Sequence, residues 1–221
     1  MVESTNSLAQ LKTDLLAKAK KHLDAYDSYD VKFNGTKVEC EVRQTNDPDM
    51  GGCIVTISKA KVPGLTIEKF KEFAAAILEN TALLDSKLKI TKLDDLEGQM
   101  RTVTTIKMPM MMTNRSIFNI YHPTDCEDGS FIGLASSIGT EEFVASAEGK
   151  KLLGKNVLAT NHINYRHIVP YDGGCHWTSV VCTDIGGSIP GALKNQAAGK
   201  MAKQAEGIIN FIMTGEKPKD D

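Results

Sequence analysis

The sequence lacks the long apolar runs that mark membrane proteins. No run approaches the roughly 20 residues that a membrane-spanning helix needs. Residues 1–6 also lack the charged-then-apolar order of a secretory signal peptide. We therefore expect a cytoplasmic protein whose association with membranes, if any, is peripheral.

An excess of basic charge is also absent. The formal net charge is −2, which argues against a nucleic-acid partner because nucleic-acid-binding proteins carry a basic surplus. The 5 cysteines are odd in number, irregularly spaced and without a C-x-x-C pair. They predict reduced thiols in a cytosolic protein, several of them at apolar strand positions.

Catalytic and metal-binding signatures are missing as well. No G-x-S-x-G, phosphate loop, H-E-x-x-H or G-x-G-x-x-G spacing occurs. The pairs His162-x4-His167 and Cys175-His176 match no zinc-site spacing, so ordinary strand histidines are the favoured interpretation. We predict no catalytic residue, no metal ligand and no cofactor.

The patterns that are present predict helices at both ends of a strand-rich chain of 221 residues. We expect amphipathic helices at 7–26 and 67–80, with Thr66 capping the second, and a β-hairpin formed by 38–42 and 53–62. A short helix is expected at 140–153, inserted between two strands. Further strands, arranged as an antiparallel meander, are predicted at 88–90, 100–108, 117–122, 131–136, 163–169 and 176–182.

A long C-terminal helix organises this pattern. Ser188 is the predicted N-cap, Pro190 suits the first turn, and Gly215 is the predicted stop. Much of its apolar stripe is small, which is typical of a docked terminal helix or, in the sharper hypothesis, of a helix that covers a hollow. The stripe contains Ile189, Leu193, Ala197, Met201, Ala205, Ile208 and Ile212.

The second half of the chain resembles the StAR-related lipid transfer (START) family. The segment Asp184-Ile185-Gly186-Gly187-Ser188-Ile189-Pro190 fits the family motif that opens the C-terminal helix, and Asn195 stands where the family often has Asn. Arg115-Ser116-Ile117-Phe118 lies where Arg-Asp-Phe is usual, and Ile168-Val169-Pro170 fits the strand end before the last hairpin. Length and element order match over residues 31–215.

The departures identify a divergent member. Ser116 replaces the usual Asp, Leu158 replaces an Arg, and Leu83-Leu84-Asp85 stands where a Trp is customary. The 140–153 insertion is longer than the family's connection.

The resemblance implies an α+β helix-grip fold, in which a curved antiparallel sheet wraps around the C-terminal helix and encloses a lipid cavity. We expect residues 1–30 to pack as a helix on a 31–215 lipid-binding domain, with a frayed tail at 216–221. The implied function is to bind one lipid, such as a sterol or a phospholipid, and to transfer it between membranes. The expected partners are that lipid and, transiently, a membrane surface, with a monomeric chain.

A methionine cluster is the most unusual local feature. Met108, Met110, Met111 and Met112 surround Pro109 between two predicted strands. Methionine is flexible and polarizable, so it adapts to ligands of varied shape. By resemblance this segment is the Ω loop over the tunnel mouth, and we predict a gate that touches the bilayer. The alternative is that the methionines fill an irregular core gap.

Further ligand contacts are predicted on the strands and on the last helix. Asn119 and Tyr121 share one strand face and could hydrogen-bond a ligand, while Arg101 could meet an anionic group or be an ordinary surface residue. Thr102 and Tyr121 fall near the positions where the family often has an acid–base pair. On the helix we expect Leu193, Ala197, Met201 and Ala205 to face the cavity, and Lys194, Lys200 and Lys203 to face anionic lipid.

Two other functions remain open. Broader relatives of the fold use the same hollow for cyclisation or hydrolysis, which requires an acid or base in the pocket, with His122 and His167 as the residues to test. A lipid sensor that changes partners on loading is the third hypothesis.

Overall fold

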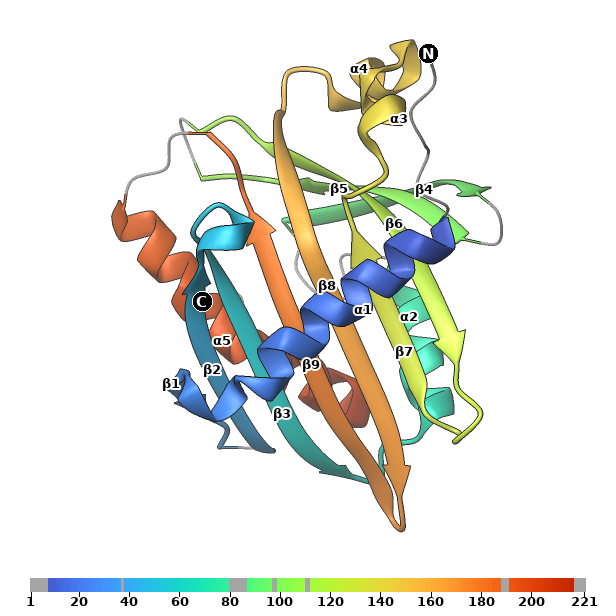
Figure 1. Cartoon of the computed structure of the whole chain (residues 1–221), viewed down its shortest axis with the longest axis vertical. Coiled ribbons are helices and arrows are strands. Elements are labelled where there is room, and N and C mark those ends of the chain that lie inside the picture. The colour runs from blue at the N-terminus through green and yellow to red at the C-terminus, as the bar shows by residue number, and fades with distance from the viewer. Residues whose placement is uncertain are drawn as a thin grey trace.

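The computed structural model describes residues 8–36, 38–79, 87–96, 99–109, 112–187 and 191–216. Within these ranges the chain forms one sheet of 9 strands with helices on both faces (Figure 1). The predicted α+β class is confirmed. In chain order the elements are α1 (Leu8–Asp24), η1 (Tyr26–Ser28), β1 (Asp30–Asn34), β2 (Glu39–Asp47), η2 (Pro48–Met50), β3 (Cys53–Pro63), α2 (Ile67–Glu79), β4 (Leu88–Leu96), β5 (Gln99–Ile106), β6 (Arg115–Asp125), β7 (Phe131–Ser136), α3 (Glu141–Ala145), α4 (Ala147–Leu153), β8 (Val157–Tyr171), β9 (Gly174–Asp184) and α5 (Gly191–Thr214).

The sheet has the strand order β1-β2-β3-β9-β8-β7-β6-β5-β4. Strands β4 to β9 form the predicted antiparallel meander, and β9 then pairs with β3, so that the N-terminal hairpin joins the far edge of the meander. A short parallel contact between β6 and β8 was not predicted. Strand β1 was not predicted, although Val31 and Phe33 alternate with polar residues along its 5 residues. The alternation is short, and the strand lies mostly exposed at the edge of the sheet.

The two faces of the sheet carry different helices (Figure 1). We call the face covered by α1 the outer face and the face covered by α5 and α2 the inner face. On the outer face Leu11 and Leu15 of α1 pack with Val55, Ile57 and Ile163. On the inner face Ile208 and Ile209 of α5 pack in a second cluster with Phe70 of α2 and with apolar strand residues such as Trp177 and Ile168. Successive residues of one strand therefore belong to two separate cores.

Helix α1 is joined to the sheet by polar contacts as well as by its apolar stripe. The His22 side chain is buried, with Nε2 3.1 Å from Oδ2 of Asp47. Its Nδ1 lies 3.1 Å from the hydroxyl of Tyr29. These contacts connect the end of α1 to the end of β2 and to the turn before β1.

The predicted single helix at 140–153 is two short helices. Ser146 has ψ 166°, an extended conformation that ends α3, and its Oγ accepts a hydrogen bond from the Gly149 amide at the start of α4. A Cβ on Gly149 would lie 2.1 Å from the Phe143 carbonyl oxygen, so this corner requires glycine.

Helix α5 ends where the sequence predicts. Gly215 has φ 75°, a left-handed conformation that suits glycine at a helix C-terminus. The predicted cap Ser188 and Pro190 lie outside the described residues. No helix in the described part of the chain has the length and apolar composition that crossing a membrane requires.

Candidate ligand-binding site beneath the C-terminal helix

Three successive cross-strand rows on the inner face change from apolar to polar, with roughly 7 Å between rows. The first row contains Cys40, Ala60, Trp177, Ile168 and Phe131. The second contains Val42, Ser58, Ser179, Arg166 and Gly133. The third contains Gln44, Thr56, Val181, Asn164, Ala135 and Tyr121. If this face formed only a hydrophobic core, the second and third rows would be as apolar as the first. Their polar side chains are suited to a role other than core packing.

A small hollow lies between these rows and α5. Its volume is about 20 Å³, and Arg166 and Trp177 of the sheet face Met201, Gln204 and Ala205 of the helix across it. A cavity needs roughly 10–15 Å³ to hold one water molecule. In this conformation the hollow therefore has room for about one water molecule and not for a lipid.

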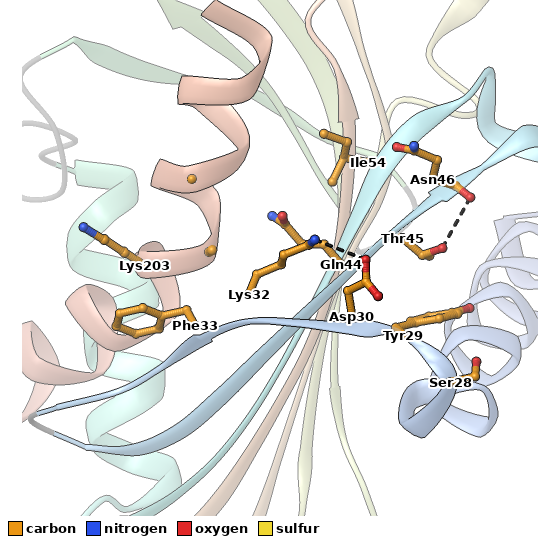
Figure 2. Close-up of a pocket in the computed structure, with 12 residues that line it drawn as sticks. Ser28, Tyr29, Asp30, Lys32, Phe33, Gln44, Thr45, Asn46, Ile54 and Lys203 are labelled. Carbon is orange, nitrogen blue, oxygen red and sulfur yellow. Dashed lines mark hydrogen bonds and ion pairs between the residues drawn. The ribbon is translucent and has the colours of Figure 1, made fainter. Parts of the chain in front are cut away.

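A much larger cleft lies beside the hollow, where α5 passes β1 and β2 (Figure 2). Its volume is about 740 Å³, which is within the usual range of small-molecule sites. Its lining is mixed: Phe33 and Ile54 are apolar, whereas Asp30 and Lys32 form an ion pair at 3.2 Å. The other residues that line the cleft are Ser28, Tyr29, Gln44, Thr45, Asn46, Gly199, Ala202 and Lys203.

One hydrogen bond joins a residue that lines the cleft to a residue that lines the hollow. Nε2 of Gln44, which lines the cleft, donates to Oγ1 of Thr56, which lines the hollow, at 3.0 Å, and both side chains are buried. The cleft and the hollow thus share one layer of the molecule, between the inner face and α5.

Arg166 is the charged residue of the second row. Its guanidinium carbon lies 5.9 Å from the centroid of the Trp177 ring, within the range of a cation–π contact. A Cβ on Gly133, the register partner of Arg166, would lie 3.1 Å from the Tyr121 hydroxyl, so Tyr121 extends over the same row. Burial lowers the pKa of the Arg166 guanidinium, and the nearby Tyr121 opposes this shift.

Several buried polar atoms near these rows have no hydrogen-bond partner among the described residues. They include Nε1 of Trp177, Oδ1 of Asn164 and Oδ1 of Asn161. Buried polar groups in folded proteins are nearly always hydrogen-bonded. Unpaired atoms on this face are therefore suited to a bound molecule or to water.

The predicted polar contacts divide between the two faces. Asn119 and Tyr121 lie on the inner face, where Oδ1 of Asn119 accepts a hydrogen bond from Nδ2 of Asn161 at 2.8 Å. Arg101 pairs in register with Ile120, one position out of phase with Asn119, and so lies on the outer face. There it forms an ion pair with Asp94 and lies over the Phe143 ring at 4.4 Å. Arg101 therefore lies away from the layer beneath α5, in keeping with the alternative prediction of an ordinary strand residue at the surface.

The predicted contacts on α5 and in the methionine loop are described only in part. Met201 and Ala205 line the hollow. Met108 and Met112 are half-buried, and their amides donate to Oδ1 of Asn114 and to the carbonyl oxygen of Pro109, each at 3.1 Å. Met110 and Met111, and the side chains of Lys194, Leu193 and Ala197, lie outside the described residues.

The lysines that were expected to face lipid are placed differently from one another. Lys200 is exposed, in keeping with a surface position. Lys203 is also exposed, but it lines the cleft, so its ammonium group is close to the candidate site as well as to solvent.

Sequence reasoning missed Arg166, Asn164 and Trp177. The signal was present, because Asn164, Arg166 and Ile168 occupy alternate positions of one strand and must share a face. Ile168 is fully buried, so its face is an interior face. The two histidines considered as catalytic candidates, His122 and His167, lie on the outer face, opposite the hollow.

Arg115, the first residue of the Arg115–Phe118 segment, has a positioning role. Its side chain is buried, and its Nε donates to the carbonyl oxygen of Ile185 at 3.1 Å. It also donates to the carbonyl oxygens of Thr113 and Gly186. One guanidinium therefore joins the end of the methionine-loop segment to the loop that precedes α5.

Comparison with solved structures identifies proteins of the same fold. Human StAR-related lipid transfer protein 5 superimposes with a TM-score of 0.72 at 12% identity, covering 94% of this chain and 96% of that one. Human STARD10 gives a TM-score of 0.68 at 12% identity, covering 96% of this chain and 80% of that one. A STAR-related lipid transfer protein fragment from Xanthomonas axonopodis gives a TM-score of 0.61 at 12% identity, covering 84% and 99%.

Sequence comparison alone does not find these proteins. No protein-family model matches the chain, and no curated protein matches its sequence. The structural likeness extends over nearly the whole chain, so the chain has the helix-grip fold of START domains.

Proposed function

We propose that this chain, whose fold is that of START domains, binds one lipid molecule between the inner face and α5 and carries it between membranes. The observation that carries the proposal is the joined cleft and hollow beneath α5, in a fold shared with lipid transfer proteins. Removing several hundred Å² of apolar lipid surface from water is worth on the order of 10 kcal/mol. That free energy would drive binding.

A bound lipid requires α5 to lie further from the sheet than it does here, because the hollow holds about one water molecule. The side chains of α5 support such a movement. Over the polar rows the helix presents the small residues Ala202 and Ala205, which give up less apolar contact on moving away than Ile208 and Ile209 of the same apolar cluster. The proposal is therefore a helix that moves away from the polar rows when a ligand binds.

The proposal assigns membrane contact to the methionine loop, with Met108, Met110, Met111 and Met112, and to the exposed lysines of α5. Each lysine near an anionic bilayer contributes about 1 kcal/mol to the free energy of membrane binding. The chain would act as a monomer and carry one lipid in each transfer between membranes. Leu193 and Ala197 belong to the proposed cavity face of α5.

Transfer of a fluorescent lipid between donor and acceptor vesicles tests the proposal, together with native mass spectrometry of the purified protein. We expect acceleration of transfer and a co-purifying lipid. Ala205→Leu fills the hollow and should slow transfer severalfold. Ala9→Leu adds the same side chain at an exposed position of α1 and should leave transfer unchanged.

Two results would count against this function. Absence of both transfer and bound lipid would remove it. Binding without transfer would replace the carrier by a lipid sensor, whose partners would then change on loading.

A further inference from the structure

The inner face contains a partly buried cation, Arg166, for which the described residues provide no carboxylate. Arg166 lines the hollow, and its described interactions are the Trp177 ring and the neighbouring Tyr121. Taking a charge out of water is unfavourable unless the charge is paired and hydrogen-bonded. Because Arg166 has no anionic partner among the described residues, it is suited to bind a negatively charged group from outside the chain.

The carboxylates closest to the layer are engaged elsewhere. Oε1 of Glu206 on α5 accepts hydrogen bonds from the amides of Thr36 at 2.6 Å and Val38 at 3.4 Å, at the loop between β1 and β2. Asp30, at the cleft, is paired with Lys32. Asp125, at the other end of the sheet, is paired with Lys71. None of these contacts involves Arg166.

Several groups around Arg166 can donate hydrogen bonds. The guanidinium has five N–H groups, Trp177 has one indole N–H, and the hydroxyls of Tyr121, Ser58 and Ser179 can each donate. The indole Nε1 is buried without a partner among the described residues. A cluster rich in donors and poor in carboxylates matches an oxyanion, and arginine is suited to bind carboxylate or phosphate by two parallel hydrogen bonds.

We propose that the ligand carries an anionic head group, a carboxylate or a phosphate, and that Arg166 binds this group in the hollow while the apolar tail extends into the cleft. This inference rests on the proposed lipid-binding function and deepens it by naming the class of ligand. The Gln44–Thr56 hydrogen bond marks where the head group would pass from cleft to hollow.

The chain contains one tryptophan, Trp177, and it lines the hollow, so its fluorescence reports directly on occupancy. Delipidated full-length protein is titrated with two matched pairs of ligands. Lysophosphatidate is compared with monoolein, and oleate with oleyl alcohol, so that each pair keeps the tail and differs in the charge of the head. Inorganic phosphate alone is the third arm.

We expect the anionic member of each pair to bind at least about tenfold more tightly, as a single charge-assisted bidentate contact allows. Arg166→Gln should abolish this preference and leave the weaker binding of the neutral ligands. Arg166→Lys should retain part of it, because the charge stays and the bidentate geometry is lost. Arg101→Gln is the matched control, an arginine at a strand position on the outer face, and should change nothing.

The outcomes separate this inference from the proposed function. Equal binding of charged and neutral ligands, unchanged in Arg166→Gln, overturns the anionic head group and leaves lipid binding intact. If no lipid binds but inorganic phosphate shifts the fluorescence of the wild type and not of Arg166→Gln, the anion site holds and the lipid function fails. If nothing binds, both fail. Should Arg166→Gln not fold, Tyr121→Phe removes one donor from the same row, and an unchanged preference in that variant would count against the inference.

Discussion

The outer and inner faces of the sheet are built from alternate residues of the same strands, yet they are filled differently. On the outer face α1 presents Leu11 and Leu15, and Leu15 is 0% exposed against Val55 and Ile57. On the inner face α5 contributes Ala202, Ala205, Ile208 and Ile209 to an apolar core, but the same stretch of the helix also borders a hollow lined by serine, threonine and arginine. The outer face is therefore packed throughout by apolar side chains, whereas the inner face combines an apolar core with polar rows, which is the arrangement that the proposed ligand site requires.

The same contrast appears in the charged residues. Arg101 on the outer face is neutralised by Asp94 at the edge of the sheet. Arg166 on the inner face is surrounded by hydroxyls and an indole, and burial lowers its pKa. An ion pair can be placed at an edge for structural reasons, whereas an unpaired interior charge requires another explanation.

The largest expected effect comes from truncating the packed face. Leu15→Ala should lower the free energy of unfolding by about 2–5 kcal/mol, because it leaves a cavity among fully buried residues. Met201→Ala on the inner face should cost less than about 1.5 kcal/mol, because Met201 is only partly buried and already borders a hollow. Urea unfolding of both variants measures the difference. Equal losses would remove the distinction between the faces.

Acid should destabilise the packed face through His122. Burial lowers the pKa of His122 from 6.5 to about 4, and neither ring nitrogen has a hydrogen-bond partner among the described residues. Between these pH values the unfolded chain binds a proton that the folded chain does not, so stability is complete above pH 6.5 and falls as the pH is lowered toward 4. The loss is on the order of 3 kcal/mol at about 1.4 kcal/mol per pH unit.

His122→Leu tests this assignment. The variant should reduce the loss of stability between pH 7.5 and pH 5, measured by urea unfolding at each pH. The buried His22 and partly buried His162 and His167 also have lowered pKa values, so part of the slope should remain. An unchanged slope in the variant would assign the acid sensitivity to those three histidines instead.

A smaller effect of opposite sign is expected on the inner face. Arg166→Met should raise the free energy of unfolding of the ligand-free protein by about 1–3 kcal/mol, because an uncompensated interior charge is replaced by an apolar chain of similar length. Thermal and urea unfolding of delipidated protein measure the change. Destabilisation of more than 1 kcal/mol would show that Arg166 has a structural partner and would weaken the comparison.

The smallest effect is expected at the other arginine. Arg101→Gln should change stability by less than about 1 kcal/mol, because its partner Asp94 is exposed and such ion pairs contribute little. Raising the salt concentration should reduce the difference in the free energy of unfolding between this variant and the wild type. A larger, salt-independent loss would indicate that the contact of Arg101 with the Phe143 ring dominates.

Much of the fold could be predicted because local patterns determine it. The alternation in 131–136 predicts β7 at its observed bounds, and Thr66 caps α2 as predicted, with its Oγ1 accepting from the Lys69 amide at 3.2 Å. The insertion at 140–153 was predicted as one helix because its composition is helical throughout. Its division at Ser146 depends on how Gly149 packs against Phe143, a contact that composition does not reveal.

The candidate site was predicted less well than the fold. Helical periodicity puts Met201 and Ala205 on the side of α5 that borders the hollow, and strand alternation puts Asn119 and Tyr121 on the inner face. Their contact with a ligand stays a prediction. Arg101 was chosen by its closeness in sequence to Thr102, although neighbours on a strand point to opposite faces. Arg166 was overlooked because nothing near it in sequence marks it as interior except its alternation with Ile168.

The sequence by itself determined most of the elements and which residues of each strand share a face, since these depend on the geometry of consecutive residues. Only the tertiary structure decided that Ser58, Ser179 and Arg166 form one row beneath α5, because that row joins three strands whose register is set by pairing across the sheet. Tertiary packing also decided how closely α5 approaches the row, and hence how small the hollow is. Periodicity specifies the direction of a side chain but not its distance from a helix that follows later in the chain.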